Sequence, residues 1–287
     1  MDDNRNYLLL DMYSKLPNSK DVLFDIISPV NMLSENATIE DWNKIVHSIK
    51  SKDISEYKGI IITHGTDTIS YFANALTYML NNVELPILIV SSNFEITNEK
   101  SNGLDNFKTA VDFILNEGTR GVFVAYKNSD GIVYIHNGES VKQITELTDN
   151  VYSINNEYFA KIENEKIVKN IEIRKHKVVS QNIEFKPKLD GILYIKPIPS
   201  QNYDFNLDNY KIVYHEMFHS GTIPKQAISF IKKCKEKDIL FFMDTKKKAI
   251  EGLYAPTEEA VKNGAIILFD MTQEASIVKL MMANRNF

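Results

Sequence analysis

The strongest chemical signal in the chain is the string His-Gly-Thr-Asp-Thr at positions 64–68. It follows an apolar run, residues 59–63, that is typical of a buried strand, and it precedes an amphipathic stretch, residues 70–80, that is typical of a helix. Open α/β sheets bind ligands where the carboxyl end of a strand meets the amino end of a helix. Hydroxyl, carboxylate and free backbone N–H groups converge there, so Thr66 and Asp67 are candidates for catalysis or ligand binding. Capping of the helix by one of these side chains explains the same pattern equally well.

A second candidate is the string His-Glu-Met-Phe-His, which begins at His215 and has the form of a zinc-protease motif. That chemistry needs His215 and His219 on one face of a helix, with Glu216 as the general base. Here the string extends a strand-like run, residues 211–214, and Pro224 follows closely, so a helix is not expected. On a strand the two histidines would lie about 13 Å apart, too far for one zinc ion. We therefore expect no metal site, and a zinc hydrolase stays the third of three candidate functions.

Other common catalytic signatures do not occur in the sequence. The chain has no Gly-x-Gly-x-x-Gly string, no phosphate-binding loop ending in Gly-Lys-Ser/Thr and no Gly-x-Ser-x-Gly elbow, so nucleotide-dependent chemistry has no support. Cys234 is the only cysteine, which excludes an internal disulfide and a cysteine-rich zinc site. A Ser-His-Asp triad stays open, because no spacing singles one out.

Apolar runs that alternate with helix-like stretches predict the elements that position these residues. Runs without polar alternation are typical of strands buried on both faces of a parallel sheet. They lie at residues 59–63, 86–90, 121–125, 191–195, 211–214, 239–243 and 265–269, whereas residues 132–135 and 166–179 are typical of antiparallel strands. We predict an α/β fold of two domains. These are a larger N-terminal domain with a mainly parallel sheet and flanking helices, a linker and a smaller parallel α/β domain, at residues 1–179, 180–188 and 189–287.

The charge balance limits the partners. Lys and Arg together number 33 against 38 Asp and Glu, a net charge of −5. Such a chain has no positive field to attract nucleic acid or an anionic membrane, so we expect neither as a partner. It has no run of about 18 apolar residues. The first residues also lack the basic head and apolar stretch of a signal peptide. The sequence therefore predicts a cytoplasmic location.

Three strings together resemble the bacterial L-asparaginase family, close to its cytoplasmic type I branch. Residues 62–68 are similar to the second signature of that family. Residues 34–42, Ser-Glu-Asn-Ala-Thr-Ile-Glu-Asp-Trp, are similar to its substrate loop and to the helix start that follows. Residues 270–275, Asp-Met-Thr-Gln-Glu-Ala, are similar to a C-terminal helix of the type I enzymes. The similarity covers nearly the whole chain in the expected order.

The resemblance implies two α/β domains with the active site in the larger one. It implies hydrolysis of L-asparagine to L-aspartate and ammonia through a threonyl acyl-enzyme, without metal or organic cofactor, by a homodimer or homotetramer. Carried over by motif, Thr66 is the second catalytic threonine and Asp67 binds the α-ammonium group of the substrate. Ser34 contacts the α-carboxylate, with Glu35 beside it. Thr222 stands where many members carry an asparagine that reaches the partner's site.

By the same resemblance, Lys142 corresponds to the lysine of the catalytic group, although its spacing alone indicates only a surface lysine. A threonine hydroxyl is a weak nucleophile and needs a neighbouring base or a cation that lowers its pKa. Lys142 next to Thr66 would supply either one, as an ammonium or as a desolvated amine, and Asp67 would balance its charge. Glu35, in contrast, would bring a negative charge near the substrate carboxylate and weaken binding of ordinary asparagine unless it is protonated or turned away.

The chain departs from the family at the family's first strand. Family members begin with a β-strand that runs into a Thr-Gly-Gly-Thr loop, whose first threonine attacks the amide, and this string does not occur here. Loss of a parallel strand would leave backbone groups of its neighbour unpaired and open a groove in the core. Three interpretations stay open: a shortened sequence of an ordinary asparaginase, a pseudoenzyme that binds an amino acid or amide as a sensor or interaction module, and a divergent amidase that uses Thr66 or another hydroxyl. We expect this chain by itself to be inactive or weak as an asparaginase.

Overall fold

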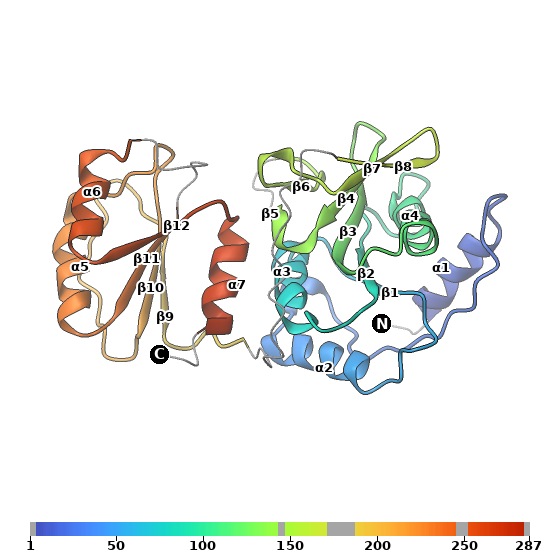
Figure 1. Cartoon of the computed structure of the whole chain (residues 1–287), viewed down its shortest axis with the longest axis horizontal. Helices are drawn as coiled ribbons and strands as arrows, with labels where there is room; N and C mark the ends of the chain where they lie inside the picture. Colours follow the sequence, from blue (N-terminus) through green and yellow to red (C-terminus); the bar gives the residue numbers. More distant parts are fainter. Residues whose placement is uncertain (1–3, 143–146, 171–186, 245–251, 284–287) are drawn as a thin grey trace. The chain divides into compact units, whose positions relative to one another are not determined.

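The computed structural model describes residues 4–142, 147–170, 187–244 and 252–283. The chain divides into two units, residues 1–185 and residues 186–287 (Figure 1). Of the predicted segments, residues 171–179 of the larger domain and residues 180–186 of the linker lie outside the described residues. Among the helices of the described part of the chain, none is long and apolar enough to cross a membrane.

The first unit is built on a six-stranded sheet in the order β1-β2-β3-β4-β7-β8. Its parallel part consists of β1 (Ile60–Thr63), β2 (Pro86–Val90) and β3 (Gly121–Lys127). Its antiparallel part consists of β4 (Val133–Asn137), β7 (Ala160–Glu163) and β8 (Lys166–Lys169). A separate antiparallel pair consists of β5 (Val141–Lys142) and β6 (Tyr152–Ser153). The sheet therefore starts parallel and continues antiparallel, and β1 is one of its end strands.

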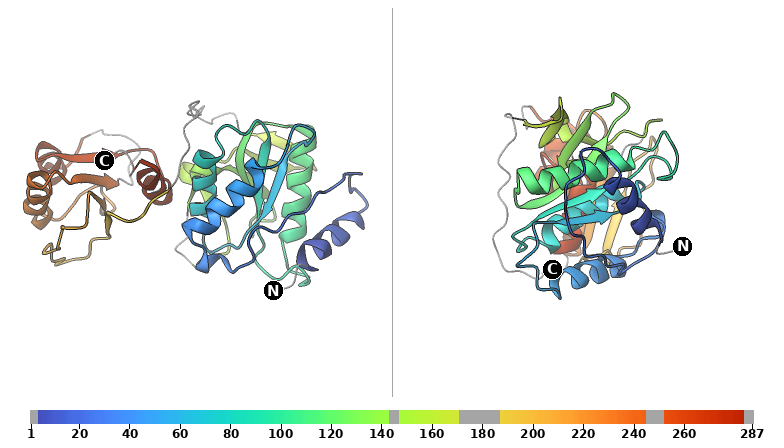
Figure 2. Two further views of the ribbon diagram at one scale, coloured as in Figure 1. Left: turned by 90° about the horizontal axis from the view of Figure 1, so that it is seen from below. Right: turned by 90° about the vertical axis from the view of Figure 1, so that its right-hand side faces the viewer.

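Helices cover both faces of this sheet. On one face lie α1 (Asn4–Ser14) and α4 (Gly103–Asn116), and on the other lie α2 (Ile39–Lys50) and α3 (Ile69–Met79) (Figure 2). The described part of the unit also contains three short 3₁₀ helices: η1 (Ser34–Asn36), η2 (Gly138–Ser140) and η3 (Ile154–Asn156). β2 is buried along its whole length, and a core cluster joins its Leu88 and Val90 to Phe107 and Phe113 of α4. β2 thus receives the cover on both faces that its apolar run requires, whereas β1 is half-buried or exposed.

The start of α2 is held by a capping box. Thr38 Oγ1 accepts a hydrogen bond from the backbone N–H of Asp41 (3.3 Å), and Asp41 Oδ2 accepts one from the backbone N–H of Thr38 (3.1 Å). Two N–H groups at the amino end of the helix are satisfied in this way. The box lies directly after η1, so it fixes the point at which the chain passes from the Ser34 segment into the helix.

The second unit contains a four-stranded parallel sheet in the order β12-β11-β10-β9. Its strands are β9 (Ile192–Ile195), β10 (Ile212–Glu216), β11 (Leu240–Asp244) and β12 (Ala265–Leu268). The helices α5 (Gln226–Glu236) and α6 (Ala255–Lys262) lie on one face, and α7 (Gln273–Ala283) lies on the other (Figure 1). A core cluster joins Val213 of β10, Ile228 of α5 and Phe241 of β11. The predicted α/β fold is confirmed.

Each unit buries a histidine in its sheet. His136 of β4 is 2% exposed, its Nδ1 lies 2.8 Å from Ser153 Oγ, and burial lowers its pKa from 6.5 to about 3. His215 of β10 is fully buried, its Nε2 lies 2.7 Å from the Tyr203 hydroxyl, and burial lowers its pKa to about 4. Both rings are therefore neutral in the folded protein at pH 7.

These two histidines predict a loss of stability in mild acid. Below pH 6.5 each imidazole binds a proton in the unfolded chain but not in the fold, so stability falls as the pH decreases toward the lowered pKa. At pH 5 we expect a loss of about 2 kcal/mol for each histidine. The free energy of unfolding should be measured in urea at pH 7 and pH 5.

His136→Asn is the matched variant, because its side-chain amide can replace the Nδ1 contact to Ser153 and does not titrate. We expect its stability to decrease by about 2 kcal/mol less than that of the unaltered chain over the same pH range. An equal decrease in both proteins would show that His136 does not contribute.

Candidate active site

The loop of residues 64–68 lies where β1 ends and α3 begins. The backbone N–H of His64 donates to the carbonyl oxygen of Val90, so the loop starts as a continuation of the parallel pairing with β2 (2.9 Å). Thr68 is the N-cap residue of α3, and its side chain makes no capping bond. Thr66 and Asp67 precede the N-cap position. The loop therefore has the strand-to-helix location that was predicted for a ligand site, without side-chain capping by Thr68.

The Ser34 segment closes over this loop. Thr68 Oγ1 donates to the carbonyl oxygen of Ser34 (2.9 Å), and the Ser34 hydroxyl lies 3.5 Å from Asp67 Oδ2. Ser34 is buried, whereas Asp67 and Glu35 are exposed. A hydroxyl and an exposed carboxylate that are 33 residues apart in the sequence thus lie close together in the structure. Such a pair can bind the ammonium and carboxylate ends of an amino acid.

Gly65 makes this close approach possible. A Cβ atom at this position would lie 2.3 Å from Ser34 Oγ and 2.8 Å from Ser34 Cβ. Atoms cannot come that close, so any side chain at position 65 would force the two segments apart. The glycine of the motif is therefore required for space.

His64, the residue that directly follows β1, fixes the start of the loop. Its Nδ1 lies 2.8 Å from the carbonyl oxygen of Gly65, and its ring stacks on that of Phe72 in α3 at 4.3 Å. Burial lowers the pKa of His64, although the Gly65 carbonyl and the Asp67 charge oppose this effect. The neutral ring donates from Nδ1, since a carbonyl oxygen can only accept. Sequence reasoning included His64 in the motif but assigned it no role, and its role in the structure is to orient the loop.

Lys142 lies on the exposed side of β5. The Asn74 side chain of α3 donates to the carbonyl oxygen of Val141 (3.3 Å), which ties β5 to the helix that follows the loop. The Lys142 ammonium lies 6.0 Å above the centre of the Tyr152 ring. Among the described residues, no hydrogen bond or ion pair joins Lys142 to Thr66 or Asp67, so its catalytic role stays a prediction.

An asparagine clasp beside the site was not foreseen from the sequence. The backbone N–H groups of Asn93 and Asn102 each donate to the side-chain oxygen of the other residue (3.0 Å in both cases). The Asn102 side chain also donates to the carbonyl oxygen of Lys127 (2.8 Å). The clasp joins the carboxyl end of β2 to that of β3. The spacing of two asparagines in a polar loop gives no signal for such a pairing.

The comparison with protein families identifies the fold. The model of the asparaginase N-terminal domain matches residues 7–175, which is more than half of the chain. The chain belongs to the asparaginase family. The prediction from the loop strings is thereby confirmed at the level of the family.

Curated relatives and solved structures agree with this membership. An L-asparaginase from Thermococcus kodakarensis is 28% identical over 256 residues, which cover 85% of this chain and 74% of the relative. The solved structure of the thermostable L-asparaginase from that organism has a TM-score of 0.78 at 25% identity, and the match covers 96% of this chain and 84% of the other. L-asparaginase I from Vibrio cholerae has a TM-score of 0.79, covering 96% and 85% of the two chains, and at 20% identity it shows the fold alone.

Other curated relatives of the chain are named not as asparaginases but as an amidotransferase subunit. A glutamyl-tRNA(Gln) amidotransferase subunit from Methanococcus maripaludis strain C7 is 29% identical over 274 residues, which cover 90% of this chain. The chain spans 65% of the length of that relative. The motifs in the sequence did not point to this second name.

The remaining predicted residues lie in the second unit of this asparaginase-family chain. Thr222 is half-buried, and its carbonyl oxygen accepts from the backbone N–H of Phe218 (2.9 Å). In the zinc-protease string, His215 and Glu216 are buried at the end of strand β10, and His219 is exposed in the following turn. The described part of the chain holds no group of three or more His, Cys, Asp or Glu side chains arranged for a metal ion. The string therefore lacks the helix that zinc binding by this motif requires.

The contact between the loop and the Ser34 segment predicts the effect of a methyl group at position 65. Gly65→Ala should lower the free energy of unfolding by about 1–3 kcal/mol, because its Cβ overlaps Ser34 Oγ. Ser34→Gly removes the overlapping atoms, so the double variant should lose less stability than the two single variants together. Urea unfolding of the four proteins measures this coupling. A Gly65→Ala protein as stable as the unaltered chain would contradict the observed contact.

Proposed function

We propose that the site formed by Ser34, Thr66 and Asp67 binds an L-amino acid that carries a side-chain amide, and that the reaction is hydrolysis of this amide, as from L-asparagine to L-aspartate and ammonia. The observation that carries the proposal is the meeting of the Ser34 hydroxyl with the exposed Asp67 carboxylate, 3.5 Å apart, at the carboxyl end of β1. Asp67 binds the α-ammonium group and Ser34 binds the α-carboxylate. Membership in the asparaginase family supports the choice of an amide.

The proposed reaction has two steps. A threonine hydroxyl adds to the amide carbon, an ester forms and ammonia leaves, and water then hydrolyses the ester to the free acid. Thr66 is the second threonine of this group, and Lys142 activates a hydroxyl either as an ammonium or as an amine. Because the string Thr-Gly-Gly-Thr does not occur in the 287 residues, we propose that this chain by itself releases ammonia slowly or not at all.

Binding of the product tests the roles of the two carboxylates. Isothermal calorimetry should detect L-aspartate binding. Asp67→Asn should weaken it by about tenfold or more, because the ammonium group loses its charged partner. Glu35→Gln is the matched control: it removes a negative charge from a neighbouring exposed residue and should not weaken binding. The absence of heat with both L-aspartate and L-asparagine would end the proposal of an amino-acid site.

Ammonia release tests the reaction. We expect the chain and its Thr66→Ala variant to release ammonia from L-asparagine at the same very low rate, because the acylating threonine is absent. Release by the unaltered chain that disappears in Thr66→Ala would show that the residues present suffice, and a divergent amidase would then be the correct interpretation. The same assay with L-glutamine separates the two amides.

A second candidate function follows from the relatives. Several of them are named as a subunit of glutamyl-tRNA(Gln) amidotransferase, and 90% of this chain matches the one from Methanococcus maripaludis strain C7. On that interpretation the chain supplies ammonia within a larger assembly and does not act alone. A pseudoenzyme that binds L-aspartate or L-asparagine without turnover is the remaining alternative, which the two assays above distinguish.

We also propose that the chain forms a homodimer or homotetramer, with Thr222 of one copy near the site of another, and that it acts in the cytoplasm. Family membership supports this assembly. Light scattering on the purified chain tests it. A monomer at all concentrations would exclude a shared site.

A further inference from the structure

β5 and β6 form a pair of strands of two residues each, and β5 carries Lys142. A two-stranded pair is at best marginally stable by itself in water, so a pair this short needs anchors elsewhere in the fold. α3 supplies the first anchor, since the Asn74 side chain donates to the carbonyl oxygen of Val141, the residue before Lys142. The place of Lys142 is therefore set by whatever else holds this pair.

The end of β3 supplies the second anchor. Asn128, the residue after β3, is buried, and its side chain accepts from the backbone N–H of Val151 (2.8 Å) and donates to the carbonyl oxygen of Val151 (3.0 Å). Asn150 makes the reverse connection, because its side-chain oxygen accepts from the backbone N–H of Ser129 (2.7 Å). Amide side chains from both segments thus fix the start of β6 to the end of β3.

Tyr152 of β6 stands directly opposite Lys142. The register of the pair joins these two residues, and side chains directly opposite in an antiparallel pair lie on the same face. The Lys142 ammonium, 6.0 Å above the centre of the Tyr152 ring, is within the range of a cation–π contact. The far end of the ring is also held, because the Asn150 amide donates to the Tyr152 hydroxyl (3.0 Å). The contacts therefore run from β3 through Asn150 and the ring to the ammonium.

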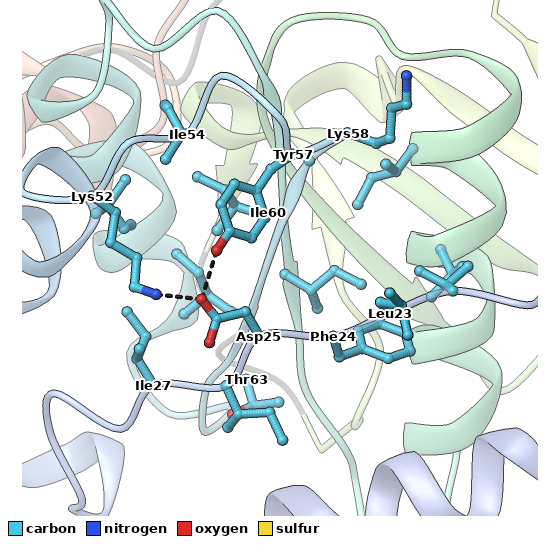
Figure 3. A pocket seen from close by; sticks show the side chains of 18 of the residues that line it. Leu23, Phe24, Asp25, Ile27, Lys52, Ile54, Tyr57, Lys58, Ile60 and Thr63 are labelled. Atoms are coloured by element: carbon cyan, nitrogen blue, oxygen red, sulfur yellow. Dashed lines mark hydrogen bonds and ion pairs between the residues drawn. The ribbon is translucent and has the colours of Figure 1, made fainter.

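Other lysines of this unit are held by carboxylates. A groove of about 1020 Å³ lies along β1 between α2 and α4, and among its lining residues the Lys52 ammonium donates to Asp25 (Figure 3). In α4, Lys108 Nζ lies 2.6 Å from Asp112 Oδ2. A carboxylate compensates the charge and occupies an N–H donor, whereas an aromatic ring attracts the ammonium and leaves its N–H donors available. A ring can thus orient Lys142 without taking it from a reacting hydroxyl.

We propose that Tyr152 is a positioning residue for Lys142, and that its ring, held by Asn150, fixes the direction in which the lysine side chain leaves β5. A tyrosine side chain rotates about two χ angles only, whereas the lysine stem is long and flexible, so the ring restricts the lysine. Restriction matters because a group that assists a reaction must be held in the correct geometry. The part that Lys142 takes in a reaction rests on the proposed function, whereas its contact with Tyr152 does not.

The ring gives this contact a spectroscopic signature. Protons above an aromatic ring are shielded, so NMR of protein labelled with carbon-13 at the ε carbon of lysine should show the Lys142 signal displaced to high field. Lys142→Arg assigns this signal by its loss. We expect the displacement to persist in Tyr152→Phe, which keeps the ring, and to disappear in Tyr152→Leu, which removes it. An equal displacement in Tyr152→Leu, or none in the unaltered chain, would overturn the proposal.

Asn150→Ala tests the anchor of the ring, and it remains informative if Tyr152→Leu does not fold. The variant keeps both Tyr152 and Lys142 but removes the donor to the hydroxyl, so the displacement of the Lys142 signal should become smaller. Asn206→Ala is the matched control: it removes a similar loop hydrogen bond, to the backbone N–H of Asp208, in the second unit and should leave the signal unchanged. Equal signals in Asn150→Ala and the unaltered chain would contradict the proposal.

L-aspartate distinguishes the failure of this proposal from that of the proposed function. Calorimetry reports whether L-aspartate binds, and the NMR signal reports whether Lys142 responds. We expect L-aspartate at saturation to shift the Lys142 signal, because the carboxylates of the ligand attract the ammonium. Binding without any shift would place Lys142 outside the site and overturn its positioning by Tyr152 for the reaction. A Lys142 signal that depends on the ring, without L-aspartate binding, would support the contact and end the proposed function alone.

Discussion

Two backbone segments meet at the candidate site because residue 65 has no side chain. The approach of Gly65 to Ser34 lets the carbonyl oxygen of Ser34 accept from Thr68 and brings the Ser34 hydroxyl to within 3.5 Å of Asp67. Without this contact the hydroxyl and the carboxylate would stand on independent loops, and neither would have a defined partner. The capping box at Thr38 fixes the end of the Ser34 segment, and the stacking of His64 on Phe72 fixes the start of the loop. The geometry of the site is therefore a consequence of packing around one glycine.

The strand that leads into the site, β1, is unusual for a parallel strand in being incompletely covered. β1 leads directly into the site, yet it is the end strand of its sheet and faces an aliphatic groove between α2 and α4. A parallel strand is ordinarily buried on both sides, because its backbone and side chains need cover. Site and groove share β1, which lines the groove and leads into the loop that begins at His64.

Family membership sets the fold, whereas the activity of this chain stays a proposal. Relatives of similar identity are named as an L-asparaginase and as an amidotransferase subunit, and both names concern the nitrogen of an amide. Only the second name is that of a subunit. In this chain the Ser34 hydroxyl and the Asp67 carboxylate, which we propose to bind an amino acid, lie together. Lys142, in contrast, is not joined to Thr66 or Asp67 by a hydrogen bond or ion pair within the described residues. Recognition is thus better supported by the geometry than catalysis is.

The sequence by itself determined the features that depend on neighbouring residues. The apolar runs at residues 59–63, 86–90 and 121–125 predicted parallel strands, and the polar string at 64–68 predicted a strand-to-helix loop, because periodicity and chain breaks are local signals. The burial of both faces predicted for residues 59–63 was wrong, because β1 is an end strand and is half-buried or exposed. The tertiary structure decided the contact of Ser34 with Asp67, the asparagine clasp of Asn93 and Asn102, and the walls of the groove beside β1. These contacts join residues that are distant in the chain. Their geometry depends on how whole elements pack, which no local pattern encodes.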